Sequence, residues 1–175
     1  MLGTAATRRP GVVRDAHARV VSVGLSWLTI LRKGEGFHRA FADWDVERIA
    51  AYGERDVKRL LSDVAIVRHR AKIEAAIASA RATVDLRADR ESLDGLLWRF
   101  APPDGAKPPA TGHDIPPAIP ELTAMAKELK RRRFRFGGPT TAYALMEAVG
   151  LVNDHLAGCE FRVPAGDMGA GEPAD

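Results

Sequence analysis

The spacing of apolar residues along the chain is that of α-helices. Through the middle of the chain they recur at intervals of three and four, at Ile73, Ala76, Ile77, Ala80 and Val84. This spacing places them on one face of an amphipathic helix and leaves Arg81 and Arg87 for solvent. Because no stretch of the sequence sustains the alternation of a half-buried strand, the pattern predicts an all-α domain.

Capping and breaking residues set the expected helix boundaries. Asp45 and Ser92 have side chains that can cap the helices that follow them, and Pro139 suits the first turn of a helix. A proline-rich stretch, residues 101–120, predicts a loop along the surface. The expected helices cover residues 45–51, 54–62, 93–100, 121–133 and 139–149.

The composition is that of one ordinary globular domain. Of the 175 residues, 46% are hydrophobic and 28% are charged, which is enough apolar surface to build one core. The formal net charge of +3 and an isoelectric point near 9.3 suit a polyanionic partner without requiring one. A single cysteine excludes an intramolecular disulfide and fits a reducing compartment.

The longest apolar run, residues 20–31, is too short to cross a membrane. It lies between Arg19 and Arg32 and contains two serines and a threonine, whereas a membrane span needs about 20 mainly apolar residues. A signal peptide is not indicated, because no small-residue cleavage site follows the run. We therefore expect a cytoplasmic protein without a membrane partner.

His155 and Cys159 are candidate metal ligands. They are four residues apart, so in a helix they would project from one face, and imidazole and thiolate both bind zinc. A closed structural zinc site needs four ligands, and Cys159 is the only cysteine, so His, Asp or Glu would have to complete it. Taken alone, the pair is more simply explained as a core histidine and a buried free thiol.

Four segments that follow one another along the chain carry a more specific signal. They are Gly24-Leu25-Ser26-Trp27-Leu28-Thr29-Ile30-Leu31, Ile66-Val67-Arg68-His69-Arg70-Ala71-Lys72-Ile73, Gly138-Pro139-Thr140-Thr141-Ala142-Tyr143 and Val152-Asn153-Asp154-His155. Together they resemble the bacterial DNA-3-methyladenine glycosylase I family, over residues 24–159. The resemblance implies a compact all-α domain with a helix-hairpin-helix element, as in other DNA glycosylases of that superfamily.

The N-terminal motifs of that family are absent from residues 1–23. Family members begin with a Cys-x-Trp segment and a His-Asp-x-Glu-Trp-Gly segment, and a glutamate lies shortly before the Gly-Leu-Ser-Trp motif. Counted back from Trp27, the glutamate position holds Arg19, and His17 does not match the family's histidine spacing. We predict three parts: a segment over 1–23 that is divergent or an artefact of a wrong start or reading frame, a glycosylase-like helical domain over 24–162, and a disordered tail over 163–175.

The second segment resembles the hairpin with which the superfamily grips DNA. Helices are expected over 56–62 and 69–82, joined by residues 63–68, with backbone amides and the second helix N-terminus holding a phosphate. The resemblance assigns phosphate contact to Ala65, Ile66, Val67, Arg68, Arg70 and Lys72. The family generally has glycine at position 65. Without the resemblance, an αα-corner with a solvated basic face is the simpler interpretation, and the basic run 127–135 is most simply a solvated helix end.

The resemblance also implies a base pocket that contains Trp27 and Tyr143. Trp27 matches the family's stacking tryptophan, whose electron-rich face suits a base made cationic by methylation at N3. Tyr143 is expected to line the same cavity, and core packing is the alternative for both side chains. Trp44 and Trp98 lie in no such motif and are expected in the core. The family's glutamate favours the positive base, whereas Arg19 in its place would repel it.

The resemblance implies a monofunctional DNA-3-methyladenine glycosylase, a hydrolase that cleaves the N-glycosidic bond of 3-methyladenine in base-excision repair. Its partner would be double-stranded DNA with an alkylated adenine, bound by a monomer. A structural zinc is also implied, poorly held because His155 and Cys159 make only half a site. Two alternatives stay open: a catalytically impaired DNA-binding module without the recognising glutamate, and a small helical interaction protein outside the family.

Overall fold

The computed structural model describes residues 27–103, 107–116, 118–135, 139–160 and 162. For residues 27–31, 139, 140 and 148 only the backbone is described. Every element within these ranges is an α-helix or a short 3-10 helix, so the prediction of an all-α fold is confirmed. None of the described helices is long and apolar enough to span a membrane.

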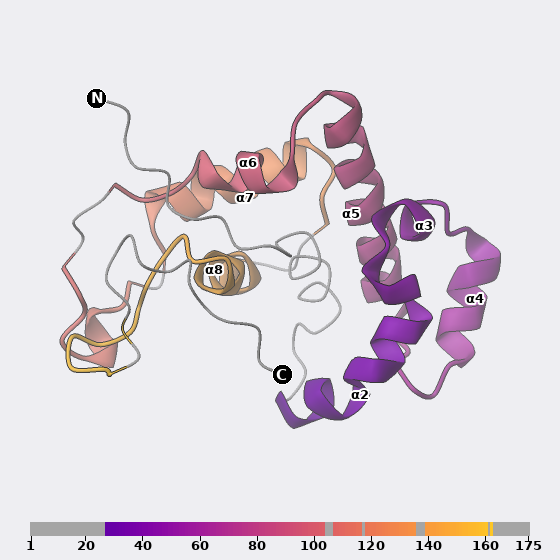
Figure 1. The fold of residues 1–175 in the computed structure, drawn as a ribbon, viewed down its shortest axis with the longest axis horizontal. Coiled ribbons are helices and arrows are strands. Elements are labelled where there is room, and N and C mark those ends of the chain that lie inside the picture. Colours follow the sequence, from indigo (N-terminus) through magenta and orange to yellow (C-terminus); the bar gives the residue numbers. More distant parts are fainter. Residues whose placement is uncertain (1–26, 104–106, 117, 136–138, 161, 163–175) are drawn as a thin grey trace.

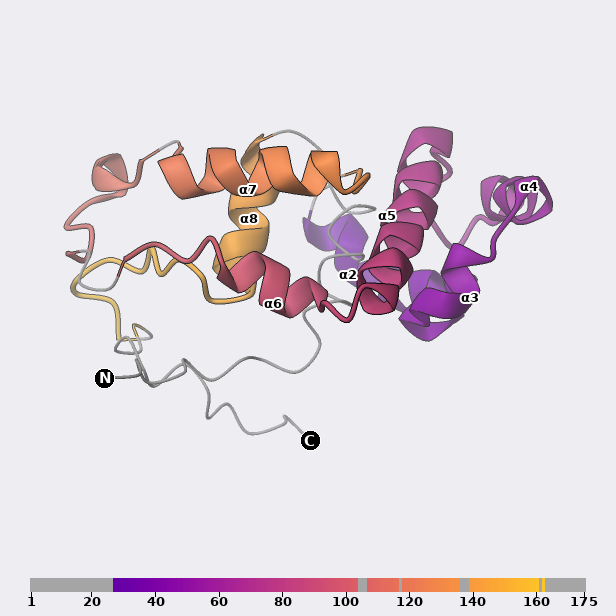
Figure 2. The ribbon, with the colours of Figure 1, turned by 90° about the horizontal axis from the view of Figure 1, so that it is seen from above.

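Helix α5 is the centre of the arrangement. In Figures 1 and 2 it stands between α3 and α4 on one side and α6 and α7 on the other. The elements that precede it are α2 (Trp27–Ala40), η1 (Ala42–Trp44), α3 (Val46–Ala50) and α4 (Glu54–Ser62). From α5 onwards they are α5 (Arg70–Ala88), α6 (Leu93–Trp98), η2 (Gly112–Asp114), α7 (Pro120–Arg131) and α8 (Pro139–Ala148).

Two apolar clusters form the core, and α5 contributes to both. The first joins α2, η1, α3, α4 and the first half of α5, and includes Phe37, Phe41, Trp44, Ile49, Leu60, Ile66, Ile73 and Ile77. The second joins the end of α5 to α6, α7 and α8, and includes Leu86, Leu93, Leu97, Leu122, Met125, Leu145 and Met146. Because successive parts of α5 bury side chains in different clusters, this one helix fixes the first cluster relative to the second.

The capping residues found in the sequence act as predicted. Asp45 accepts a hydrogen bond from Arg48 N at 2.9 Å, and Ser92 Oγ accepts one from Gly95 N at 2.9 Å. Each bond satisfies an amide that the first helical turn leaves without a partner. Trp44 is buried in the first cluster and Trp98 packs against the second, as expected for both.

The predicted boundaries need correction in several places. Helix α5 runs to Ala88, beyond the predicted end at residue 82, because Leu86 finds a place in the second cluster. Helices α6 and α7 each end two residues before the predicted position. The loop over 101–120 contains the short helix η2, in which the Asp114 carboxylate accepts from Thr111 N at 2.7 Å. Helix α2 was not delimited by the pattern at all.

Two helices end in arginines with a left-handed backbone. Arg90 follows α5 with φ 60°, and Arg133 follows the end of α7 with φ 67°. After each, the next amide returns to a carbonyl five residues back, from Glu91 to Leu86 and from Phe134 to Leu129, both at 2.9 Å. This closure favours glycine at the left-handed position, because a Cβ there is strained.

Substituting glycine at either position is therefore expected to stabilise the fold. Arg90→Gly and Arg133→Gly should each raise the free energy of unfolding by about 0.5–1 kcal/mol. Glycine relieves the strain of the left-handed backbone, and this gain exceeds the cost of its greater conformational freedom in the unfolded chain. Lys130→Gly, inside α7, is the control and should lower it by about 1 kcal/mol. Urea denaturation measures all three. Loss of stability in Arg133→Gly would show that the arginine side chain contributes more than its backbone costs.

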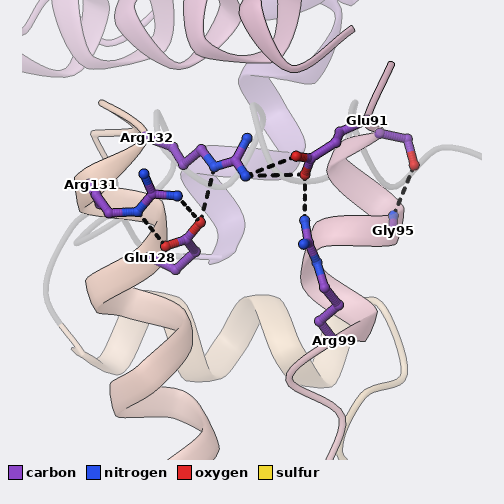
Figure 3. Close-up of polar contacts among 7 residues, drawn as sticks. Glu91, Gly95, Arg99, Glu128, Arg131 and Arg132 are labelled. Carbon is purple, nitrogen blue, oxygen red and sulfur yellow. Dashed lines mark hydrogen bonds and ion pairs between the residues drawn. The ribbon is translucent and has the colours of Figure 1, made fainter. Parts of the chain in front are cut away.

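An ion-pair network joins these two helix ends (Figure 3). The Glu91 carboxylate accepts from Arg132 at 3.0 Å and from Arg99, which links the end of α5 to α6 and α7. Glu128 accepts from Arg131 at 2.7 Å and from Arg132 at 3.0 Å, and these bonds lower the pKa of Glu128 to about 2. Arg131 and Arg132 are thus already paired within the protein.

Candidate functional site

The segment between α4 and α5, residues 63–69, is the centre of the predicted DNA-binding site. In Figure 1 it lies along the lower edge of the molecule, together with the start of α2. The boundaries of α4 agree with the sequence prediction, and α5 begins at Arg70, one residue later than expected. We call residues 63–69 the α4–α5 turn.

Helix α2 holds the α4–α5 turn in place. Lys33 Nζ donates to Val64 O at 2.7 Å. At Gly36 the backbones meet so closely that a Cβ there would lie 2.4 Å from Ala65 O and 2.9 Å from Ala65 Cβ. The methyl group of Ala65 therefore faces α2. A glycine at position 36 is required by this contact.

The contact at Gly36 makes a specific prediction about stability and DNA binding. Gly36→Ala should push the α4–α5 turn away from α2 and cost about 1–3 kcal/mol of folding free energy, as overpacking against backbone does. Gly34→Ala is the matched control on the same helix, since a Cβ there meets nothing within 4 Å. It should be neutral or stabilising by up to about 1 kcal/mol. Urea denaturation and duplex binding of both variants test this, and equal stability would contradict the contact.

Within the turn, the backbone is shaped by Asp63. Its carboxylate accepts from Ala65 N at 2.8 Å, and its carbonyl accepts from Ile66 N at 3.4 Å. The Ile66 side chain is fully buried in the first cluster. Of the residues predicted to contact phosphate, Ala65 and Ile66 thus have their amides satisfied inside the turn, and Ile66 serves as its apolar anchor.

Four of the amides that follow have no acceptor in the part of the chain that the structure describes, whereas His69 N donates to Val67 O at 3.0 Å. Lys72 N and Ile73 N both donate to His69 O, at 3.1 Å. His69, the N-cap of α5, gives no side-chain hydrogen bond, and the first turn of α5 carries no carboxylate. The unpaired amides belong to Val67, Arg68, Arg70 and Ala71. A helix N-terminus with free amides and an uncompensated dipole attracts anions.

The three basic side chains of the turn and of the start of α5 have different surroundings. Arg68 is exposed and makes no ion pair with any described residue. The Arg70 guanidinium donates to Glu54 at 2.9 Å and to Glu74 at 3.1 Å, and the bond to Glu54 is the main cause of its raised pKa. Lys72 is half-buried, and burial lowers its pKa.

Tyr143 lies on α8, half-buried against the second cluster. Its hydroxyl donates to Asp154 Oδ2 at 2.5 Å. Burial, and then this bond to a carboxylate, raises the pKa of the Tyr143 hydroxyl, so the phenol stays protonated. The bond ties α8 to the Val-Asn-Asp-His segment. The side chain of Trp27 and the whole of Arg19 lie outside the described residues.

His155 and Cys159 lie side by side, as a shared metal site requires. His155 Nδ1 is 3.3 Å from Cys159 Sγ. The stretch that holds them is a turn and not a helix, closed by Cys159 N donating to Leu156 O at 2.9 Å. His155 is exposed and Cys159 half-exposed, so the alternative of a core histidine and a buried thiol is wrong. Among the described residues, no third candidate ligand joins them.

Comparison with known proteins decides the family. The model of a protein family described as methyladenine glycosylase matches residues 18–163 of this chain. The chain belongs to this family. It is 41% identical over 137 residues to "DNA-3-methyladenine glycosylase 1" of Escherichia coli, covering 78% of the chain and 73% of that relative. It is 37% identical over 145 residues to the Haemophilus influenzae "DNA-3-methyladenine glycosylase", covering 79% of the chain and 76% of that protein.

Solved structures agree with this methyladenine glycosylase assignment. A crystal structure of 3-methyladenine DNA glycosylase I has TM-score 0.79 and 38% identity, covering 90% of this chain and 89% of that one. The Staphylococcus aureus enzyme, in a structure described as the basis of 3-methyladenine recognition, has TM-score 0.76 and 30% identity, covering 90% and 85%. The family match begins at residue 18, earlier than the resemblance over 24–159 indicated, and so includes Arg19.

Several residues that build the α4–α5 turn and its surroundings were not found from the sequence. Asp63 had a readable signal, since Asp two residues before an amide often accepts from it in a turn. Glu74 also had one, since it follows Arg70 by four residues in a predicted helix, a spacing that favours an ion pair. Lys33, Gly36 and Glu54 had none, because their roles depend on contacts between helices. In the basic run 127–135, Arg131 and Arg132 are paired with carboxylates, which supports the interpretation of an ordinary helix end.

Proposed function

We propose that this protein is a DNA-3-methyladenine glycosylase that acts as a monomer on double-stranded DNA containing alkylated adenine. The observation that carries the proposal is the family match over residues 18–163, with relatives named for this activity. The likeness to a structure described for 3-methyladenine recognition supports the same substrate.

The reaction is a hydrolysis with one bond broken and one formed. The bond between N9 of the methylated base and C1′ of the deoxyribose breaks, and its electron pair stays with the base. Because methylation at N3 had made the base cationic, it leaves as neutral 3-methyladenine. Water supplies the oxygen that bonds to C1′ and releases a proton to solvent, which leaves an abasic site and no strand break. The protein must extrude the base to reach this bond.

The α4–α5 turn and the start of α5 are proposed as the phosphate-binding element, in the manner of a helix-hairpin-helix. The free amides of Val67, Arg68, Arg70 and Ala71 point to this role, because they lie where the α5 dipole also favours an anion. Arg68 adds a cationic side chain that no described carboxylate engages. Ala65 and Ile66 are proposed to act through the shape of the turn, and Lys72 through its charge.

Trp27 and Tyr143 are proposed to line the base pocket. Trp27 would stack on the extruded base from the first turn of α2, the helix whose Lys33 and Gly36 also hold the α4–α5 turn. Base and phosphate would thus be held at a fixed separation by one rigid helix. Tyr143, oriented by Asp154, would support the pocket from α8.

His155 and Cys159 are proposed as two of the four ligands of a structural zinc. Their donor atoms, 3.3 Å apart, fit adjacent corners of a tetrahedral site. When bound, the metal would serve folding and not the reaction. We expect weak zinc retention by this chain, since no matching pair of ligands is identifiable in residues 1–23. One tightly held zinc per chain by elemental analysis would contradict this expectation.

A second candidate function is a catalytically impaired DNA-binding module. The presence of Arg19 inside the matched range, at the position counted for the recognising glutamate, favours it. Release of free 3-methyladenine from methylated duplex, followed by chromatography, separates the two candidates. The glycosylase releases the base faster than spontaneous depurination does, whereas the impaired module binds duplex in a salt-dependent manner and releases nothing.

A further inference from the structure

The guanidinium of Arg70 is held by two carboxylates at the edge of the proposed phosphate site. It donates to both oxygens of Glu54, at 2.9 and 3.2 Å, and to Glu74 Oε1 at 3.1 Å. Glu54 is the first residue of α4 and Glu74 lies one turn along α5. The Arg70 side chain, at the first residue of α5, reaches the first residue of α4, so these acids approach the same guanidinium from two helices.

The carboxylates offset part of the positive charge around the α4–α5 turn. Glu54 and Glu74 both pair with Arg70, and Asp63 adds a third carboxylate within the turn. The cations Lys33, Arg68 and Lys72 lie on or beside the same turn, and Lys58 lies close enough to Glu54 to lower its pKa. Charges within about 10 Å of a phosphate act on it at physiological ionic strength. The sequence predicted cationic side chains at this hairpin, and the structure shows that carboxylates offset part of their charge.

The features that remain attractive to a phosphate act only at short range. The free amides of Val67, Arg68, Arg70 and Ala71 act only at hydrogen-bond distance. They therefore stabilise DNA whose phosphate is docked on the turn and do not attract DNA from further away. Long-range attraction, in contrast, raises affinity for any duplex, damaged or not. A site with free amides and offset side-chain charge therefore binds correctly docked DNA without strong affinity for DNA in general.

We propose that Glu54 and Glu74 restrain the electrostatic affinity of this turn for undamaged DNA by holding Arg70 and opposing its charge. The inference rests on the proposed function, because it assumes that the turn contacts a phosphate. Removing either carboxylate frees part of the Arg70 charge for DNA and removes a repulsion. The protein then binds undamaged duplex more tightly and spends longer on it.

These ion pairs can be broken without unfolding the protein. Arg70 and Glu54 are 46% and 60% exposed, and Glu74 is 41% exposed. Pairs exposed to this degree contribute little to stability, because water screens them. The pair of Arg87 with Glu47 is a close match, at 46% and 62% exposed, and also joins α5 to another helix. It lies at the opposite end of α5 from the α4–α5 turn, so Glu47→Gln controls for net charge and for loss of an ion pair.

The test is the binding of an undamaged duplex of about two helical turns, followed by fluorescence anisotropy over a salt series. Glu54→Gln and Glu74→Gln should each tighten binding roughly threefold to tenfold at low salt, the effect of one charge close to a phosphate. The double variant should also steepen the dependence of log K on log salt by about one. Glu47→Gln should stay within about twofold of the unsubstituted protein.

Two results would overturn the inference while the proposed function stands. If Glu54→Gln and Glu74→Gln had the same affinity for duplex and the same salt dependence as Glu47→Gln, the carboxylates would not act on DNA. Weaker binding by Glu54→Gln or Glu74→Gln would show that they support the grip. An unsubstituted protein that binds no duplex even at low salt would instead refute the proposed phosphate site itself, and the inference with it.

Discussion

Replacing Arg19 by glutamate is expected to raise the rate of 3-methyladenine release by about a hundredfold or more. A carboxylate at this position would accept hydrogen bonds from the base and favour its positive charge, whereas a guanidinium repels it. Hydrogen bonds to a charged, desolvated group are worth a few kcal/mol, and each 1.4 kcal/mol corresponds to about one decade in rate. The family match from residue 18 onward places Arg19 within the homologous region.

The measurement is the single-turnover rate of base release from methylated duplex, with protein in excess. Arg14→Glu is the control, because it makes the same change of charge at a position before the matched range. Its rate should equal that of the unsubstituted protein. Equal rates of base release by Arg19→Glu and Arg14→Glu would show that Arg19 does not occupy the place of the recognising glutamate. Rapid base release by the unsubstituted protein would show the same.

Replacing Trp27 by alanine is expected to lower kcat/KM for excision by about tenfold to a hundredfold, because stacking of a base on an aromatic ring is worth roughly 1–3 kcal/mol. Affinity for undamaged duplex should change little, since an intrahelical base does not reach the pocket. Trp27→Phe keeps an aromatic face and should retain most of the activity.

Excision by the Trp27 variants is best measured in the Arg19→Glu background, because the expected rate there is high enough for a decrease of about tenfold to a hundredfold to be measured. Duplex binding by the same proteins separates the base pocket from the phosphate grip. If Trp27→Ala lowered duplex binding and excision by the same factor, the tryptophan would act on folding or on general DNA contact and not on the extruded base.

Local chemistry explains why much of the fold could be predicted. Asp45 and Ser92 cap helices with their own side chains, and the start and end of α4 follow from residues within the segment itself. The end of α5 could not be predicted in this way, because it depends on Leu86 reaching a cluster built from residues after position 92. Helix ends set by tertiary packing leave little trace in the local pattern.

In the candidate site too, contacts between residues close in sequence could be predicted, whereas contacts between helices could not. His155 and Cys159 were predicted to meet and do so, but through a turn, since four-residue spacing brings side chains together in more than one backbone shape. Arg70 was predicted to contact phosphate, beside the other cationic side chains Arg68 and Lys72. Its main partner, Glu54, is 16 residues away and reaches it only once α4 and α5 are folded against each other.

The central claim, that the protein is a 3-methyladenine glycosylase, is tested most directly by base release from a methylated duplex under single-turnover conditions. The assay compares this chain with a chimaera in which residues 1–23 are replaced by the corresponding segment of the Escherichia coli relative. We expect slow release by the chain, at least about a hundredfold faster release by the chimaera, and free 3-methyladenine without strand cleavage as the product. A chimaera that binds and saturates the duplex but releases no 3-methyladenine would contradict the claim.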